Sequence, residues 1–386
     1  METLRRSIPD AQFTLLSLSA QQDIALSAND DLNVVPQLES FSSKAQLLFG
    51  ALLSRFKIDP SFLFGSQVVQ AIQEYKNADA VIDIWGIIFA DQMGGGFLRR
   101  LGEGYHLLVG KLFGKPVIKY TADTGPFNSR WNRFFAKFFF SRIDLIFARS
   151  EISRNHLVEL GIKTPIYVFP DTAFLLPIST TVKAHDLMPA SALNRPIIGI
   201  SVSHTVEGKE PEVNLYSTIM AQICDYLVEK HGAYILLIPN NVFRTTYDDL
   251  DVAKKILERV LEKRNVLVIS ESYPAQELKG IISQCEIMIG ARYHSIVASL
   301  SLGIPTIAIA WHHKYPEILK LVGQENCMCN VENLSFTHLK EKIDKLWNDR
   351  NEIHMEITTR LPSVNDSILY GGEKVKELLN GQKNLS

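Results

Sequence analysis

Two polar residues interrupt a long apolar segment, and their types and spacing suit the binding of an anion. Residues 287–289 predict a buried strand that turns at Gly290, and a helix is expected to begin near Tyr293. Arg292 and His294 therefore lie where the carboxyl end of a strand meets a helix N-terminus, which offers backbone N–H groups and the positive end of a dipole. An arginine fork suits phosphate or carboxylate, and a histidine can move a proton near neutral pH. The pattern favours a functional site over the alternative, an exposed arginine beside a packed histidine.

A further cationic residue follows the next predicted strand, residues 306–310. Lys314 can hold a phosphate as a point charge, although a solvated lysine fits the pattern equally well. His312 and His313 are adjacent, so their side chains would point in different directions, and no carboxylate partner is evident. The sequence therefore predicts no metal site, and no cofactor is expected.

The elements that must position these residues alternate regularly along the chain. Short apolar, β-branched runs are separated by longer helical patterns, which is typical of parallel α/β domains. We predict two Rossmann-like domains that face a cleft, with ligands bound beyond the carboxyl ends of the strands. The predicted strands are residues 13–18, 80–84, 117–120, 145–148 and 166–169, then 197–202, 234–238, 266–269, 287–289 and 306–310.

The alternation breaks once, and this break sets the predicted domain boundary. Residues 178–195 mix Ser, Thr, Pro and His without periodicity, which indicates a linker. We therefore expect a first domain over residues 1–177, a second over residues 196–360, and a helical tail over residues 361–386.

The first predicted domain begins unusually. A Rossmann unit normally opens with a buried strand and a glycine-rich turn, whereas residues 2–7 predict a helix that precedes the strand at Phe13. We expect either that the natural protein starts further upstream or that this copy has lost its first strand and loop. The sheet of the first domain should then lack a central strand.

Composition limits the class of partner. The 386 residues carry 40 Lys and Arg against 42 Asp and Glu, so the basic excess typical of nucleic-acid binders is missing and no nucleic-acid partner is expected. Four cysteines without a Cys-x-x-Cys pair indicate neither a disulfide scaffold nor a zinc site. The first residues do not resemble a secretory signal. These features favour a globular cytoplasmic protein whose anionic ligand is a small molecule.

Several motifs, in order along the chain, resemble those of the polysaccharide pyruvyl transferase family. Residues 289–294, Ile-Gly-Ala-Arg-Tyr-His, followed by Gly303-Ile304-Pro305 and Lys314, are similar to the family's C-terminal signature. In the first half, residues 148–153 look like its Arg-Asp-Glu-x-Ser element, residues 170–174 like its Asp-Pro-Ala-Phe turn, and residues 124–126 like its Gly-Pro turn. Residues 85–91 occupy the place of a glycine-rich loop. The family's Asp after Arg149 is replaced by Ser150, and its opening strand and Asn-x-Gly-Asp loop have no counterpart.

The resemblance implies a fold of glycosyltransferase-B type that binds phosphoenolpyruvate in its second domain. It implies transfer of the pyruvyl group onto two hydroxyls of a sugar, in a polysaccharide or its lipid-linked precursor, with a cyclic ketal formed and phosphate released. Arg292 and Lys314 are then candidate clamps for phosphate and carboxylate, and His294 is the candidate general acid.

The first domain supplies the other candidate substrate-binding residues, which are Arg149, Asp171, Gly86 and Asp91. Arg149 is placed to reach the carboxylate of the donor, and an ion pair with Glu151 or Asp171 is an equal alternative. Asp171 is favoured to fix the turn that contains it rather than to act as a base.

Two other functions stay open. A nucleotide-sugar glycosyltransferase of the same fold is the nearest alternative. However, the places where retaining members carry two glutamates eight residues apart hold Gly290 and Ala298. The reduced glycine-rich loop would also suit a catalytically inactive binding homologue.

A basic and aromatic segment suggests peripheral contact with a membrane. Five phenylalanines lie between residues 134 and 140, among the basic residues Arg130, Arg133, Lys137 and Arg142. Such a helix suits an anionic lipid surface that carries a lipid-linked acceptor. Packing of the phenylalanines in the core is the favoured alternative.

Overall fold

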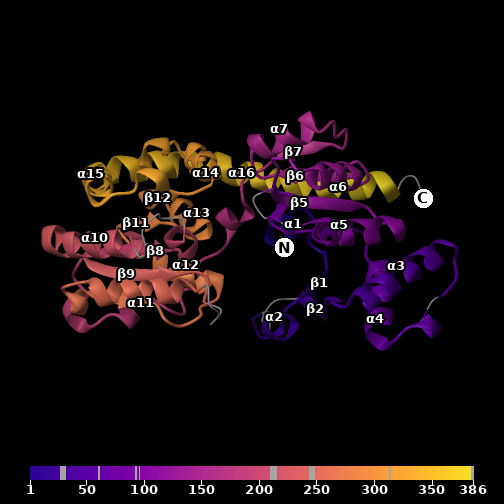
Figure 1. The fold of residues 1–386 in the computed structure, drawn as a ribbon, viewed down its shortest axis with the longest axis horizontal. Helices are drawn as coiled ribbons and strands as arrows, with labels where there is room; N and C mark the ends of the chain where they lie inside the picture. Colours follow the sequence, from indigo (N-terminus) through magenta and orange to yellow (C-terminus); the bar gives the residue numbers. More distant parts are fainter. Residues whose placement is uncertain are drawn as a thin grey trace. The chain divides into compact units, whose positions relative to one another are not determined.

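The computed structural model describes residues 1–26, 32–59, 61–91, 94, 96–208, 215–242, 248–312 and 314–383. The chain divides into two compact units, one formed by Met1–Asp171 with Ser367–Ser386 and the other by Thr172–Asp366. Both units contain parallel strands connected by helices (Figure 1), which confirms the α/β class predicted from the alternating pattern.

The second unit is built on a six-stranded parallel sheet with the order β10-β9-β8-β11-β12-β13. Its central strands are buried on both faces, which explains why their sequences are continuous apolar runs. The short edge strand β13 was not predicted, because three residues carry too little pattern. The strands are β8 (Ile197–Val202), β9 (Tyr234–Pro239), β10 (Val266–Val268), β11 (Ile287–Gly290), β12 (Thr306–Ala310) and β13 (Met328–Asn330).

Helices pack on this sheet and form two apolar clusters. One cluster joins the sheet to α10, α11 and α15, and the other joins it to α8 and α12. The helices are α8 (Ala184–Leu187), α9 (His204–Glu207), α10 (Leu215–His231), α11 (Asp249–Arg259), α12 (Ala275–Ile282), α13 (Tyr293–Ser301), α14 (Lys314–Leu321) and α15 (Phe336–Asn348).

The segment predicted as a linker, residues 178–195, is instead part of the second unit. It contains α8 and a short 3-10 turn, and Ala184, Met188 and Ala192 are buried in the cluster that includes α12. Lys279 of α12 also donates hydrogen bonds to the carbonyls of Phe174 and Leu176, at 3.2 and 2.7 Å. Sequence periodicity missed this packing because the anchoring residues are single small or apolar side chains.

The strands of the first unit do not form one continuous sheet. β3, β5, β6 and β7 are hydrogen-bonded in that order and β4 pairs with β5, whereas β1 and β2 form a separate parallel pair. This agrees with the expected interruption of the sheet. The strands are β1 (Phe13–Ser17), β2 (Leu32–Pro36), β3 (Val81–Asp83), β4 (Ile87–Ile88), β5 (Val117–Thr124), β6 (Leu145–Ala148) and β7 (Ile166–Val168).

The helices of the first unit begin and end where their residues allow. Ser150 caps α7 by accepting a hydrogen bond from the Ser153 amide at 3.2 Å, and Gly161 after that helix has a φ of +79°. The helices are α1 (Glu2–Ser7), α2 (Ala20–Leu26), α3 (Phe41–Arg55), α4 (Ser66–Asn77), α5 (Phe97–Leu112), α6 (Arg130–Phe140) and α7 (Glu151–Glu159).

Residues 361–383 of the predicted tail, which was expected over residues 361–386, belong to a longer helix, α16 (Arg350–Lys383). Its residues from Ser367 onward are part of the first unit, where Val375 is buried among Leu4, Ile118 and Phe169. The C-terminal segment is therefore a structural component of the first unit. None of the helices in the described ranges is long and apolar enough to cross a membrane.

His106 of α5 allows a test of how α5 packs in the first unit. Its ring nitrogens contact the Gln37 amide nitrogen and the Tyr75 hydroxyl, each at 2.7 Å, and burial lowers the pKa of His106 to about 4. Between pH 6.5 and pH 4 the unfolded chain therefore binds a proton that the folded chain excludes, so stability falls as the pH falls through this window.

We expect His106→Gln to remove on the order of 1–2 kcal/mol of this acid destabilisation, measured by urea unfolding at neutral pH and at about pH 4.5. The exposed His185, changed to Gln, is the matched control. An unchanged pH dependence in the His106 variant would contradict the prediction.

Candidate functional site

The order of strands in the second unit points to one edge of its sheet. From β8 the chain adds β9 and β10 on one side and β11, β12 and β13 on the other, so its direction reverses between β8 and β11. In open parallel sheets, ligands bind at such a reversal, beyond the carboxyl ends of the strands. His204 lies just beyond the end of β8 and Arg292 just beyond the end of β11.

The carboxylate of Asp249 lies at the centre of this edge and is fully buried. It accepts hydrogen bonds from the backbone amides of His204 and Asn241, both at 2.9 Å, and from Nε of Arg292 at 2.7 Å. A second guanidinium nitrogen, Nη2 of Arg292, donates to its other oxygen. Asp249 therefore ties together the ends of β8, β9 and β11.

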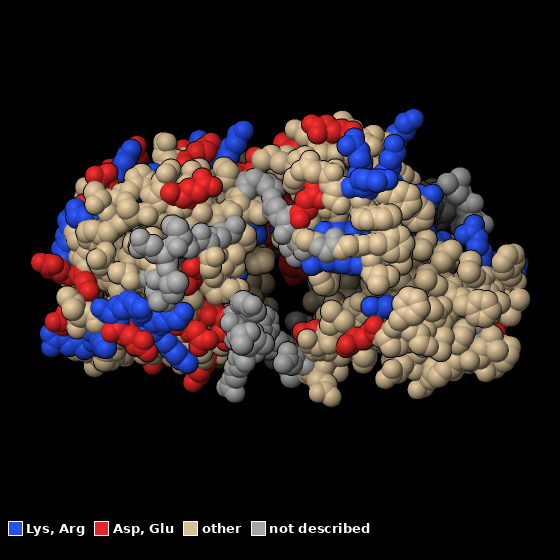
Figure 2. Space-filling model, viewed as in Figure 1, with Lys and Arg blue, Asp and Glu red and all other residues tan. Residues whose placement is uncertain are grey.

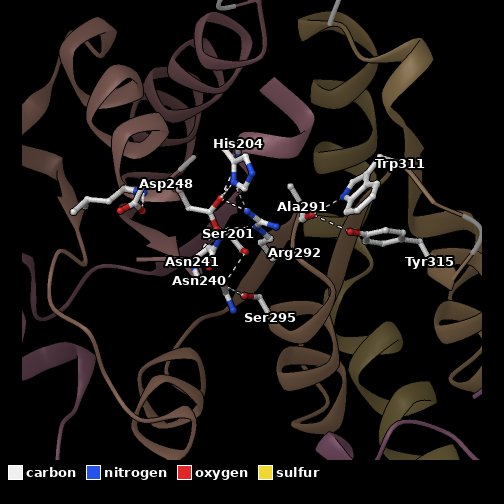
Figure 3. Close-up of polar contacts among 12 residues, drawn as sticks. Ser201, His204, Asn240, Asn241, Asp248, Ala291, Arg292, Ser295, Trp311 and Tyr315 are labelled. Atoms are coloured by element: carbon white, nitrogen blue, oxygen red, sulfur yellow. Dashed lines mark hydrogen bonds and ion pairs between the residues drawn. The ribbon is translucent and has the colours of Figure 1, made fainter. Parts of the chain in front are cut away.

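Arg292 is the N-cap residue of α13, at the junction of strand and helix that the sequence predicted. Its Nη2 also lies 2.7 Å from Nδ1 of His204 (Figure 3), and its side chain is 18% exposed. The guanidinium is thus oriented by Asp249 while part of it stays accessible. A fixed and partly accessible cation of this kind suits the phosphate or carboxylate of a ligand.

The charge of Asp249 depends on these contacts. Burial alone would raise the pKa of Asp249, but the hydrogen bonds and charge of Arg292, with the backbone amides, outweigh burial and the pKa is lowered. The carboxylate is therefore ionised at neutral pH, and it forms a buried ion pair with Arg292.

A second polar group lies beside this ion pair. Oδ1 of Asn240 accepts hydrogen bonds from Ser201 at 3.3 Å and from Ser295 (Figure 3). These residues lie at the ends of β9 and β8 and in the first turn of α13. The contacts join the ends of β8 and β9 to the start of α13.

Two aromatic side chains hold the turn before Arg292. Nε1 of Trp311 and the Tyr315 hydroxyl both donate to the carbonyl of Ala291, at 3.2 and 3.0 Å (Figure 3). This shared acceptor joins the turn after β11 to the segment after β12.

Lys314 and His294 both lie beside Tyr293. Nζ of Lys314 is 4.6 Å from the centroid of the Tyr293 ring and 5.6 Å from that of Trp311. The His294 ring meets the same tyrosine edge-on with the centroids 5.6 Å apart, and its residue is exposed in the first turn of α13. The structure therefore brings Arg292, His294 and Lys314 to one edge of one unit. Their roles stay predictions.

Arg149 in the first unit is held by two acids. Its guanidinium lies 3.1 Å from Oδ2 of Asp123 and 3.2 Å from Oδ2 of Asp171, and it donates to the carbonyl of Thr121 at 3.0 Å. A Cβ on Gly86 would lie 3.2 Å from Nη2 of Arg149, so this loop approaches closely because it has no side chain there.

Arg149 therefore forms the ion pair with Asp171 that was one of the alternatives expected from the sequence. It also pairs with Asp123, which the sequence analysis did not single out. Glu151, the other partner considered, pairs with Arg154 at 3.4 Å. Arg149, Asp171 and Gly86 nevertheless form one group at the carboxyl ends of β3, β5, β6 and β7.

Asp91 does not join this group. Its carboxylate accepts hydrogen bonds from the amide of Ser129 at 3.2 Å, from the amide of Asn128 and from the side chain of Asn132. These contacts hold the segment that leads into α6. Asp91 therefore has a structural task in addition to the substrate-binding role predicted for it.

Sequence reasoning missed His204, Asn240 and Asp249. A signal existed for the first two, because they follow the strands 197–202 and 234–238 directly, in the position that drew attention to Arg292. Asp249 had no such signal, since only folding brings the start of α11 to the end of β11. Among the described residues no cluster of His, Cys, Asp and Glu could hold a metal ion, and His313 lies outside those residues.

A family model described as polysaccharide pyruvyl transferase matches residues 2–313. The chain belongs to the polysaccharide pyruvyl transferase family. This pyruvyl transferase family member is similar to the amylovoran biosynthesis protein AmsJ of Erwinia amylovora, with 25% identity over 300 residues that cover 75% of this chain and 70% of AmsJ.

Solved structures share the fold at low sequence identity. Staphylococcus aureus MnaA in complex with UDP matches with a TM-score of 0.54 and 14% identity, over 97% of each chain. The UDP-GlcNAc 2-epimerase of Neisseria meningitidis matches with a TM-score of 0.56 and 14% identity, over 96% of this chain and 99% of that one. Anabaena HepE in complex with UDP-glucose matches with a TM-score of 0.55 and 13% identity, over the same shares. The fold is therefore of glycosyltransferase-B type.

The Asp249–Arg292 pair gives a stability prediction. We expect Asp249→Asn to lower the free energy of unfolding by about 3 kcal/mol, because the guanidinium loses its counter-charge in a largely buried place. Arg292→Gln should have an effect of similar size. The double variant should cost less than the sum of the two, since neither charge remains unpaired. Urea unfolding of the four proteins measures this coupling, and strictly additive losses would contradict it.

Proposed function

We propose that the protein transfers the pyruvyl group of phosphoenolpyruvate onto two hydroxyls of one sugar in a polysaccharide or its lipid-linked precursor. Membership of the polysaccharide pyruvyl transferase family carries this proposal. The similarity to AmsJ, named for the biosynthesis of the polysaccharide amylovoran, supports it. The oriented Arg292 at the strand reversal provides the positive charge that an anionic donor needs.

The proposed reaction forms two C–O bonds and one C–H bond at C2 and the methylene carbon, and it breaks the C–O bond to phosphate, the carbon–carbon π bond and two hydroxyl O–H bonds. One sugar oxygen adds to C2 of phosphoenolpyruvate while the methylene carbon receives a proton, and the second sugar oxygen then displaces phosphate from C2. Two C–O bonds of the ketal form and the C–O bond to phosphate breaks. The two hydroxyl protons are accounted for by the new methyl group and the released phosphate.

We assign the binding of the donor's anionic groups and the delivery of the proton to different residues of the second unit. Arg292 and Lys314 are the proposed clamps for the phosphate and carboxylate of the donor, and both follow strands of the same sheet. His294 is the proposed general acid that protonates the methylene carbon, because it lies two residues after Arg292 and is exposed. Arg149, Asp171, Gly86 and Asp91 remain the proposed substrate-binding residues of the first unit. The four cysteines are free thiols, which is in keeping with a proposed cytoplasmic location.

Donor binding separates this proposal from the glycosyltransferase alternative. We expect phosphoenolpyruvate to raise the melting temperature and UDP-glucose to leave it unchanged. Lys314→Gln should weaken phosphoenolpyruvate binding at least about tenfold in isothermal titration, because one charge-assisted contact is lost. Lys320→Gln, an exposed change on the same helix, is the control. Stabilisation by UDP-glucose and not by phosphoenolpyruvate would instead favour the glycosyltransferase.

Turnover tests the role of His294. His294→Gln should keep the affinity for phosphoenolpyruvate but slow phosphate release by about 100-fold, since proton delivery contributes to the chemical step and not to donor binding. The acceptor for this assay is polysaccharide from the source cells freed of its ketals by mild acid. His338→Gln on α15 is the matched control. A wild-type protein that binds phosphoenolpyruvate and releases no phosphate with this acceptor would identify an inactive homologue.

A further inference from the structure

The outward face of α6 carries three cations without an acidic partner. Arg130, Arg133 and Lys137 are exposed, and within the described ranges of the chain none of them lies in an ion pair or a side-chain hydrogen bond. The other basic side chains of the first unit mostly have partners, such as Arg149 with Asp123 and Lys111 with Asp144. The positive charge on this face is therefore available to an external anion.

Aromatic side chains are exposed between these cations. Trp131 is 49% exposed and Phe134 is 56% exposed, and together with the three cations they line a shallow surface hollow of about 510 Å³. Phe97 of α5 extends the same surface, because its ring meets that of Trp131 edge-on with centroids 5.2 Å apart. We call this surface, formed by Arg130, Trp131, Arg133, Phe134, Lys137 and Phe97, the α6 patch.

Packing of the core does not account for the α6 patch. Phe135, Phe139 and Phe140 lie on the opposite side of the helix and are buried in the core of the first unit, as the favoured interpretation of the sequence required. Trp131 and Phe134 contact Phe135 on one side but leave about half of their surface exposed to solvent. Large aromatic side chains left in water lose the free energy of burial, so their grouping marks a surface that binds something else.

The chemistry of the α6 patch matches an anionic bilayer. Aromatic rings enter the boundary between headgroups and acyl chains, and arginine and lysine beside them meet the phosphates. Further aromatic residues are exposed elsewhere on the first unit: Phe41, Phe56 and Phe62 are 74–80% exposed. Helix α5 packs against both α3 and α6. In Figure 2 the area where Figure 1 places α3 and α4 is almost entirely uncharged. A broad surface whose hollow is open to solvent fits a membrane better than one specific protein partner.

We propose that the α6 patch binds the surface of a membrane rich in anionic phospholipids. The cations contact lipid phosphates, and Trp131 and Phe134 insert beside them. The inference does not depend on pyruvyl transfer, because binding to lipid is measured without phosphoenolpyruvate or a sugar acceptor.

Flotation of the full chain with vesicles tests the charged component. We expect binding to vesicles of phosphatidylcholine with phosphatidylglycerol, weak binding to phosphatidylcholine alone, and release at high salt. The variant Arg130→Gln with Arg133→Gln and Lys137→Gln should bind about 100-fold more weakly, since each basic residue near such a surface contributes about a factor of five. Lys254→Gln with Arg259→Gln and Lys263→Gln removes the same charge from the second unit and should bind like the wild type.

A second pair of variants tests the aromatic component. Trp131→Ser with Phe134→Ser should weaken vesicle binding about tenfold. Leu261→Ser with Met355→Ser, which changes two exposed apolar residues of the second unit, should not weaken it. Matching thermal unfolding curves for all variants exclude misfolding as a cause. The proposal is overturned if the wild type does not bind the anionic vesicles, if it binds both vesicle types equally, or if either control variant loses as much binding as its partner.

Discussion

The buried carboxylate of Asp249 is the constraint on which the site of the second unit depends. A carboxylate can remain charged in a protein interior only when donors surround it, and here the donors come from the ends of β8, β9 and β11. The same contacts that keep Asp249 ionised fix Arg292 and His204 at the reversal of the sheet. The positive group that would face an anionic ligand is therefore positioned by a negative group beneath it.

The first unit follows the same rule at its own strand ends. Asp123 and Asp171 hold Arg149, and Lys119 of β5 is fully buried with its Nζ 2.9 Å from Asp83. Burial lowers the pKa of Lys119, and the nearby Asp83 opposes that shift. Arg149 and Arg292 are thus each paired with at least one buried acid. This matching contributes to the near-neutral charge of the chain, although cations gather where ligands are expected.

Helix α6, eleven residues long, has one face that packs in the core and another that is exposed to solvent. Its inner face, with Phe135 and Phe139, packs in the core of the first unit, and its N-terminus is held by Asp91. Its outer face exposes basic side chains together with about half of the surface of Trp131 and Phe134. The sequence pattern of α6 does not distinguish its buried aromatic residues from its exposed ones. The exposed fraction of each side chain in the structure does distinguish them.

The amino-acid sequence was sufficient to predict the α/β class, most of the strands and the strand–helix junction that carries Arg292 and His294. These features are local: apolar runs, caps such as Ser150 and turns such as Gly161 depend on neighbours in the chain. It also led us to expect a sheet of the first unit that lacks a central strand; in the structure β1 and β2 form a pair separate from the other strands. It did not give the packing of residues 178–195, the acids that hold Arg149 and Arg292, or the role of Asp91 before α6.

These features became visible only in the folded chain, because each depends on residues that come together from distant parts of the sequence. Asp249 and Arg292 are 43 positions apart, and no periodicity links them. A strand can be predicted from its own residues. An ion pair such as Asp249–Arg292 forms only when folding brings two distant segments to one edge of a sheet.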